Sequence, residues 1–459
     1  MKSILFIFLI QALGYLPFAQ STLFKAGDRV CFVGNSITAG GGFHHNISLY
    51  YTTRFPNQPL TFINCGVPGD QCYNVLKRMN SDILIHHPTY AVIKLGMNDV
   101  MRKYYGSIPT NNVDTLRLRE NAINVYKEKF DSIIHIFLSK NIKVILQKPT
   151  IYDQTAIIKK ENNFGVNDAL KVCADYIQTL ADKYQLPVVD YWTILNKINT
   201  DLQKKEASAT IIGQDRVHPG AEGHLIMAYQ FLKTTNSPKY VAQIIIDNNT
   251  KRSNQLSTNC TLKNVEVKKG GFQFKVKENA LPFPISDDQK QGLELVSFID
   301  DLSVEQLVVN HCTANKYELT IDDSIIGFFS AAELSKGINL SNCHNTPQYQ
   351  QANTVKTILN KLWKDESDIR TIAFVEYNTL NTFQGNLNDL GAVKTYLDSV
   401  YSNKFSKTEY ASYYKSQFEK YLKLCSMRKL LTDEVEKLRV KAYQAAQPVE
   451  HQFAIKEVN

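Results

Sequence analysis

The sequence predicts an α/β domain with a five-stranded parallel sheet, followed by a small β module and a helical C-terminal region. From residue 29 to about 235, short apolar runs alternate with longer stretches of 3.6-residue period, which is typical of a parallel sheet covered by helices on both faces. Residues 261–340 show strand-like alternation instead. Beyond residue 346 the apolar residues return to helical spacing, which predicts the third part.

Five apolar runs are the predicted strands of the sheet, and they cover residues 29–33, 60–64, 90–95, 142–147 and 187–190. Helical spacing lies between and after them, at residues 74–86, 116–139, 166–184 and 221–232. Ligands of such sheets bind outside the carboxyl ends of the strands. We therefore expect the chemistry in the residues directly after these runs.

Ser237, Pro238 and a polar stretch at 247–259 mark a boundary behind the α/β part. A turn at 322–324 separates two predicted strands of the β module. The expected divisions are an α/β domain at 20–236, a β module at 258–345 and a helical region at 346–459.

The first 19 residues have the pattern of a secretory signal. Lys2 precedes an apolar run at 4–16, and Ala19 is the small residue expected before a cleavage site. This run is shorter than the ~20 residues that a membrane span needs. A buried N-terminal helix is the alternative. We expect cleavage after Ala19 and a secreted or periplasmic protein with no stable membrane insertion.

Composition excludes several classes of protein. The chain has 459 residues, of which 44% are hydrophobic and 21% charged, so it is not a disordered tail, a collagen or a coiled-coil rod. A net charge of +8 spread along the chain does not indicate nucleic-acid binding. Eight scattered Cys form neither a disulfide framework nor a CxxC zinc pattern.

No cofactor and no metal are predicted. The His pairs at 44–45 and 86–87 lack a carboxylate at ligand spacing and are interpreted as surface or helix-end residues. The glycine run at 40–42 lacks the Lys and Ser/Thr of a phosphate loop, and we interpret it as a flexible rim beside the site.

Polar residues suited to acyl transfer follow the predicted strands. Ser36 follows the first strand, Gly66 the second and Asn98 the third, while Asp215 and His218 lie in the loop before the last helix. Each has an ordinary explanation as a turn or helix-cap residue. A carboxylate three residues before an imidazole can also fix its tautomer, which leaves the other ring nitrogen free to deprotonate a serine.

Taken in this order, the motifs resemble the SGNH branch of the GDSL esterases and lipases over about residues 29–232. The resemblance implies a three-layer fold and assigns Ser36 as the nucleophile, His218 as the general base and then acid, and Asp215 as its orienting carboxylate. It implies an oxyanion hole formed by the backbone N–H groups of Ser36 and Gly66 and by the Asn98 amide. Asn35 and Ile37 depart from the Asp and Leu usual in the first block, but neither carries the reaction.

The resemblance further implies a serine ester hydrolase that forms an acyl-enzyme. Exported bacterial members with extra modules resemble carbohydrate esterases, so a carbohydrate O-acetylesterase acting on polysaccharide is the predicted function. A lipase, lysophospholipase or thioesterase is one alternative, and a non-catalytic glycan-binding or scaffold protein is another. The expected partner is an acylated carbohydrate or other small ester, and the oligomeric state is left open. An aromatic stripe from Tyr410 to Tyr421 is interpreted as packing.

Overall fold

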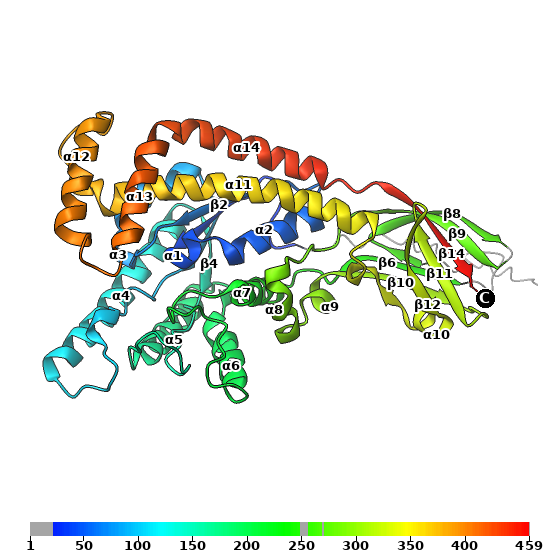
Figure 1. The fold of residues 1–459 in the computed structure, drawn as a ribbon, viewed down its shortest axis with the longest axis horizontal. Coiled ribbons are helices and arrows are strands. Elements are labelled where there is room, and N and C mark those ends of the chain that lie inside the picture. The colour runs from blue at the N-terminus through cyan, green and yellow to red at the C-terminus, as the bar shows by residue number, and fades with distance from the viewer. Residues whose placement is uncertain (1–21, 248–255, 269, 459) are drawn as a thin grey trace, which may run out of the picture.

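The computed structural model describes residues 22–247, 256–268 and 270–458 (Figure 1). The predicted signal at 1–19 lies outside these residues. Among the described residues, no helix is both long and apolar enough to cross a membrane.

The predicted five-stranded parallel sheet is present, with the strand order β2-β1-β3-β4-β5. The strands are β1 (Arg29–Gly34), β2 (Thr61–Gly66), β3 (Tyr90–Lys94), β4 (Lys143–Gln147) and β5 (Val188–Val189). Alternate residues of β1 enter different cores: Val30 and Phe32 face one side of the sheet, whereas Cys31 and Val33 face the other. Both faces are therefore buried, as the near-continuous apolar runs indicate.

Helices cover both faces of the parallel sheet, and the carboxyl ends of its strands lie at one edge. The helices of this part are α1 (Ser36–Ala39), α2 (Gly42–Arg54), α3 (Cys72–Arg78), α4 (Val113–Ser139), α5 (Val166–Tyr184), α6 (Tyr191–Gln203) and α7 (Ala221–Thr234). Helices α2 and α7 pack on the side of Phe32, and α3, α4 and α5 pack on the side of Val33. Helix α2 was not predicted, because its residues are buried around most of its circumference and show no apolar stripe.

The β module is built from two sheets that enclose a separate core. One sheet has the strand order β13 (Ile338–Asn339), β10 (Val304–Asn310), β6 (Tyr240–Asp247) and β7 (Leu256–Thr258). The other sheet has the strand order β12 (Ser324–Ser330), β11 (Lys316–Ile321), β14 (Glu450–Glu457), β9 (Gly271–Glu278) and β8 (Cys260–Lys268). Short helices α8 (Lys290–Leu295), α9 (Phe298–Leu302) and α10 (Ala331–Lys336) join these strands. Strand β14 was not predicted, because it is a single short strand directly after a long stretch of helical spacing.

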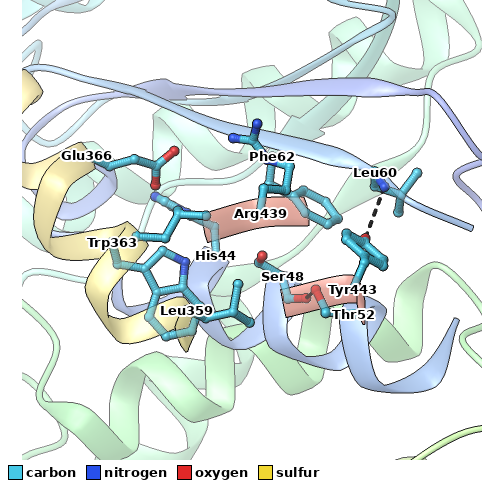
Figure 2. Close-up of a pocket in the computed structure, with 11 residues that line it drawn as sticks. His44, Ser48, Thr52, Leu60, Phe62, Leu359, Trp363, Glu366, Arg439 and Tyr443 are labelled. Carbon is cyan, nitrogen blue, oxygen red and sulfur yellow. Dashed lines mark hydrogen bonds between the residues drawn. The ribbon is translucent and has the colours of Figure 1, made fainter. Parts of the chain in front are cut away.

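The C-terminal helices are α11 (Pro347–Asn378), α12 (Leu390–Val400), α13 (Ala411–Leu424) and α14 (Arg428–Ala445). Helix α11 runs along the α/β part beside α2, with α14 alongside it (Figure 1). At this junction Trp363 stacks on His45 with ring centroids 4.4 Å apart. The Tyr443 hydroxyl accepts a hydrogen bond from the backbone N–H of Leu60 at 3.0 Å (Figure 2). The helical region is therefore packed into the sheet domain rather than attached as a separate unit.

Candidate active site

Ser36 lies at the first position of α1, directly after β1. The side chain of Asn35 caps this helix by accepting a hydrogen bond from the N–H of Ile37 at 3.2 Å. A Cβ at Gly34 would meet the Thr38 side chain at 2.2 Å and the carbonyl oxygen of Lys94 at 2.7 Å, so the turn requires glycine there. The tight turn leaves the Ser36 N–H without an acceptor among the described residues and half-exposes its side chain.

The imidazole of His218 lies against Ser36, although the two residues are 182 positions apart. Its Nε2 is 2.7 Å from Ser36 Oγ, and its Nδ1 is 2.5 Å from Oδ2 of Asp215. With the proton on Nδ1, the ring donates to the carboxylate, and Nε2 accepts from the serine hydroxyl. The three side chains thus form the base-nucleophile arrangement that acyl transfer requires.

The carboxylate of Asp215 is held in its ionised form. Its Oδ1 accepts the backbone N–H groups of Val217 at 2.9 Å and His218 at 3.0 Å. Partial burial opposes ionisation, but these bonds and the bond from the His218 ring keep the pKa of Asp215 well below its ordinary value. The charged carboxylate can therefore orient the ring and stabilise an imidazolium.

Arg216 fixes the loop between these two residues. It has a positive φ of 67°, and its buried guanidinium donates to the backbone carbonyls of Asp153, Ala156 and Lys160 at 2.9–3.0 Å. The role of Arg216 was not predicted, because an arginine side chain that binds only backbone carbonyls has no partner recognisable in a motif.

We expect Arg216→Ala to lower kcat by about 100-fold while KM for a small ester changes little. Loss of three anchoring bonds lets the loop shift, and misplacement of a catalytic group by about 1 Å costs on this order. Steady-state kinetics on p-nitrophenyl acetate checks this, with circular dichroism to show that the variant is folded. An unchanged kcat in a folded variant would mean that His218 does not depend on Arg216 for its position.

Asn98 lies at the turn after β3 and faces the same space as Ser36. Its Nδ2 donates to the carbonyl oxygen of Asp70 at 3.0 Å, which leaves one hydrogen of the amide for a ligand. Its Oδ1 accepts from Nη1 of Arg102 at 3.0 Å, which fixes the orientation of the amide. The predicted position of Asn98 beside the serine is therefore observed.

Gly66 lies at the end of β2, but its N–H is not available for the predicted oxyanion hole. Its N–H donates to Oδ1 of Asn64 at 3.0 Å, and a Cβ at this position would lie 2.2 Å from the backbone nitrogen of Ala39. The residue is buried as the last residue of β2, so its amide is not available to a substrate. Gly69, three residues later, lines the cleft at a φ of 85°, and its N–H has no acceptor in the described part of the chain. Two glycines occur close together in this segment, and spacing alone did not tell them apart.

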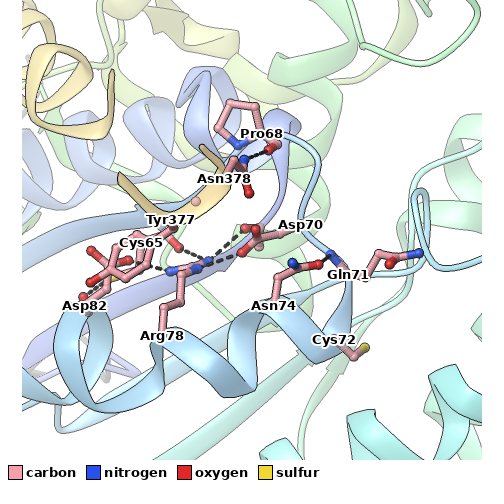
Figure 3. A network of polar contacts seen from close by, with 12 residues as sticks. Cys65, Pro68, Asp70, Gln71, Cys72, Asn74, Arg78, Asp82, Tyr377 and Asn378 are labelled. Carbon is pink, nitrogen blue, oxygen red and sulfur yellow. Dashed lines mark hydrogen bonds and ion pairs between the residues drawn. The ribbon is translucent and has the colours of Figure 1, made fainter. Parts of the chain in front are cut away.

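A buried ionic network fixes the loop that carries Gly69 (Figure 3). Arg78 donates to Asp70 at 2.6 Å and to Asp82 at 2.5 Å, and Arg370 of α11 makes a two-bond contact with Asp82 at 2.8 and 2.9 Å. Burial raises the pKa of Asp70 to about 6 against the opposing effect of Arg78. The network joins the C-terminal helical region to the ends of the strands.

Helices α11 and α13 form the second wall of the cleft. The volume of the cleft is about 530 Å³, and it lies between Ser36, Gly69, Asn98 and His218 on one side and these two helices on the other. The residues of the second wall are Ser367, Arg370, Thr371, Phe374, Tyr410, Tyr413, Tyr414, Gln417 and Lys420. Tyr410 and Tyr413 are 54% and 41% exposed, whereas Phe418 and Tyr421 are buried. The aromatic stripe therefore packs on one side and lines the cleft on the other, which corrects its interpretation as packing alone.

The described residues contain no group of three or more His, Cys, Asp or Glu arranged to hold a metal ion. The first His pair, which was interpreted as surface or helix-end residues, lies at a helix end, in the first turn of α2, but not on the surface. His44 is buried and lies 2.9 Å from the carbonyl oxygen of Thr38, and His45 stacks on Trp363. Burial lowers the pKa of His44 to about 4, so this ring is a neutral part of the core.

Comparisons with known proteins show a family and several proteins to which this chain is similar. The model of the GDSL-like lipase/acylhydrolase family matches residues 32–226. A solved structure of a gut microbial diltiazem-metabolizing enzyme is 30% identical, has a TM-score of 0.86 and covers 96% of this chain and 99% of its own. An acetylxylan esterase of Geobacillus stearothermophilus is 20% identical over 223 residues, which are 45% of this chain and 94% of that protein. Its crystal structure has a TM-score of 0.37, with 19% identity over 46% of this chain and 95% of its own. The first likeness thus extends over all three parts of the fold, and the second over less than half of the chain.

Proposed function

We propose that this chain, which belongs to the GDSL-like lipase/acylhydrolase family, hydrolyses esters through Ser36, His218 and Asp215. We further propose that its ester substrates are acetylated carbohydrates. Ester hydrolysis is the activity of the family. The observation that carries the residue assignment is the 2.7 Å contact between His218 Nε2 and Ser36 Oγ, with Asp215 on the other ring nitrogen.

In the proposed reaction Ser36 Oγ attacks the ester carbonyl carbon while its proton passes to Nε2 of His218. The tetrahedral intermediate collapses when the bond to the alkoxy oxygen breaks, and that oxygen takes the proton from His218. Water then attacks the acyl-enzyme by the same route, so that a carboxylic acid and free Ser36 are formed. The Asp215 carboxylate keeps the ring oriented in both halves.

Three donors are suited to the oxyanion: the N–H of Ser36, the N–H of Gly69 and the amide of Asn98. Each faces the cleft with a hydrogen that no described residue accepts. Gly69 replaces Gly66 in this assignment, because the Gly66 N–H is bonded to Asn64. Donors that are fixed before the reaction stabilise developing charge without reorganisation, and each contributes about 3 kcal/mol to transition-state stability.

Several features favour a carbohydrate ester over a lipid ester. The exposed rings of Tyr410 and Tyr413 offer flat apolar faces on which a sugar ring can stack, and Gln417 and Lys420 add polar groups beside them. A relative at 20% identity is named an acetylxylan esterase. The export signal proposed for residues 1–19 is consistent with a secreted or periplasmic enzyme whose substrate is a polymer outside the cytoplasm.

Chain-length preference and acetate release test this proposal. We expect p-nitrophenyl acetate to be hydrolysed about ten times faster than p-nitrophenyl decanoate, because charged and polar side chains such as Arg102, Gln417 and Lys420 line the cleft beside Ser36 and are unfavourable neighbours for a long acyl chain. We also expect acetate to be released from acetylated glycans. Assays on acetylated xylan, pectin and mannan measure the second point. A preference for the decanoyl ester would favour the lipase alternative, and absence of turnover on every ester would favour a binding protein.

A further inference from the structure

Two cationic side chains line the cleft without an anionic partner. They are Arg102, from the side of Asn98, and Lys420, from α13 on the opposite wall. No Asp or Glu is among the described residues that line this cleft. Arg370 also lines it, but its charge is compensated by Asp82 at 2.8 Å.

Arg102 presents an unused edge of its guanidinium to the cleft. Its Nη1 donates to the carbonyl oxygen of Met97 at 2.7 Å and to Oδ1 of Asn98 at 3.0 Å, whereas Nε and Nη2 donate to no described residue. Burial lowers the pKa of Arg102, and the carboxylate that opposes this shift is Asp215, which already accepts three hydrogen bonds. The positive charge of the Arg102 guanidinium is thus partly removed from water without being neutralised by a carboxylate. This burial costs free energy, and the binding of an anion would offset that cost.

Lys420 lies on the cleft-facing side of α13, in line with the tyrosines. Positions 410, 413, 417 and 420 recur at helical spacing and face the same space. Lys420 is exposed and forms no ion pair within the described part of the chain. Lys420 is therefore an exposed cationic residue of the wall that faces Arg102 across the cleft.

From this arrangement we propose that the preferred substrates are acetylated acidic glycans, in which a uronate carboxylate binds Arg102 or Lys420 while an acetyl ester on the same chain reaches Ser36. This inference rests on the proposed carbohydrate function and specifies its substrate class. A guanidinium matches the two oxygens of a carboxylate, and a charge-assisted bond of this type in a cleft with no competing carboxylate favours an anionic sugar by about 10-fold or more.

Chemically O-acetylated trigalacturonate and its methyl ester provide a matched pair of substrates, because they differ in charge and share the same backbone. We expect kcat/KM for acetate release to be at least about 10-fold higher on the free acid. Because one partner is exposed to solvent, 0.5 M NaCl should reduce this preference. Acetylated xylotriose serves as a second neutral substrate.

Lys420→Glu tests the cationic wall directly. We expect it to reduce the preference for the free acid over the methyl ester by about 10-fold or more, since it replaces an attractive charge by a repulsive one. Lys415→Glu makes the same change at an exposed position of α13 that does not line the cleft, and it should leave the preference unchanged. Lys420→Gln separates loss of the charge from repulsion and is expected to give a smaller loss of preference.

The outcomes distinguish this inference from the function on which it rests. If p-nitrophenyl acetate is hydrolysed but no glycan releases acetate, the carbohydrate function is wrong and the inference is wrong with it. If acetate is released equally from the free acid, the methyl ester and xylotriose, the carbohydrate function stands and only the acidic preference is overturned. A preference that survives Lys420→Glu unchanged would exclude Lys420 as the carboxylate contact.

Discussion

Replacement of Ser36 by alanine is expected to lower kcat on every ester by about 10⁵-fold or more. The hydroxyl oxygen is the atom that forms the acyl bond, and among the described residues no other hydroxyl lies within hydrogen-bonding distance of the His218 ring. Because Ser36 is only half-buried, the free energy of unfolding should change by no more than about 1 kcal/mol. Initial rates on p-nitrophenyl acetate, with thermal unfolding of the same samples, measure both quantities.

Ser139→Ala is a matched control for this variant. Ser139 is exposed at the end of α4, and its hydroxyl donates to the backbone carbonyl of Ile136. The Ser139→Ala variant should keep the full rate of ester hydrolysis. Loss of activity in Ser36→Ala would then be due to the loss of the hydroxyl at position 36 and not to a serine-to-alanine change as such. A folded Ser36→Ala protein with most of its activity would exclude Ser36 as the nucleophile.

The second large effect is expected at Arg370, which lies on α11 far along the chain from the motifs. Arg370→Met removes both bonds to Asp82 and the Nε bond to the carbonyl oxygen of Gly66. Removal of one partner from a buried ionic network leaves charge without compensation, so the free energy of unfolding should fall by about 3–5 kcal/mol. Urea denaturation followed by circular dichroism measures this. Arg117→Met, at an exposed pair with Asp114, should cost less than about 1 kcal/mol.

The same network predicts how this loss depends on pH. Burial raises the pKa of Asp82, but Arg370 and Arg78 outweigh burial and hold it well below the ordinary carboxyl value. A carboxylate with a lowered pKa stabilises the fold above its unfolded pKa of about 4, and this contribution is lost as pH falls toward the lowered value. The difference in unfolding free energy between wild type and Arg370→Met should be full at pH 7 and smaller at pH 3. An equal difference at both values would mean that the interaction with Asp82 is not ionic.

The sheet and most of the candidate site were predictable because they depend on local patterns. Apolar runs identified all five parallel strands. Polar residues after the strands and in the loop before the last helix predicted Ser36, Asn98 and His218, which lie in one cleft. Gly66 was assigned to the oxyanion hole in place of Gly69. The spacing of the two glycines does not show that Gly69 adopts a positive φ, the backbone conformation that leaves its N–H free.

The opposite wall of the cleft was not predictable from motifs. Tyr413 and Lys420 come from a helix almost four hundred residues after Ser36, and their spacing is the same whether the tyrosines pack or face a ligand. The buried contacts of Arg370, the stacking of Trp363 on His45 and the hydrogen bond of Tyr443 with Leu60 are among the contacts that fix how the helical region meets the sheet. Such contacts depend on how side chains of distant segments fit together, and the spacing of residues along the sequence does not predict that fit.

Covalent labelling with diethyl p-nitrophenyl phosphate tests the central assignment most directly. An activated serine attacks the phosphorus and retains one diethylphosphoryl group, with release of one equivalent of p-nitrophenol. We expect mass spectrometry of peptides to locate this group on Ser36, in proportion to the loss of esterase activity, and His218→Ala to prevent the labelling. Full inactivation with the group on another residue, or an unlabelled Ser36 in the inactivated protein, would contradict the account.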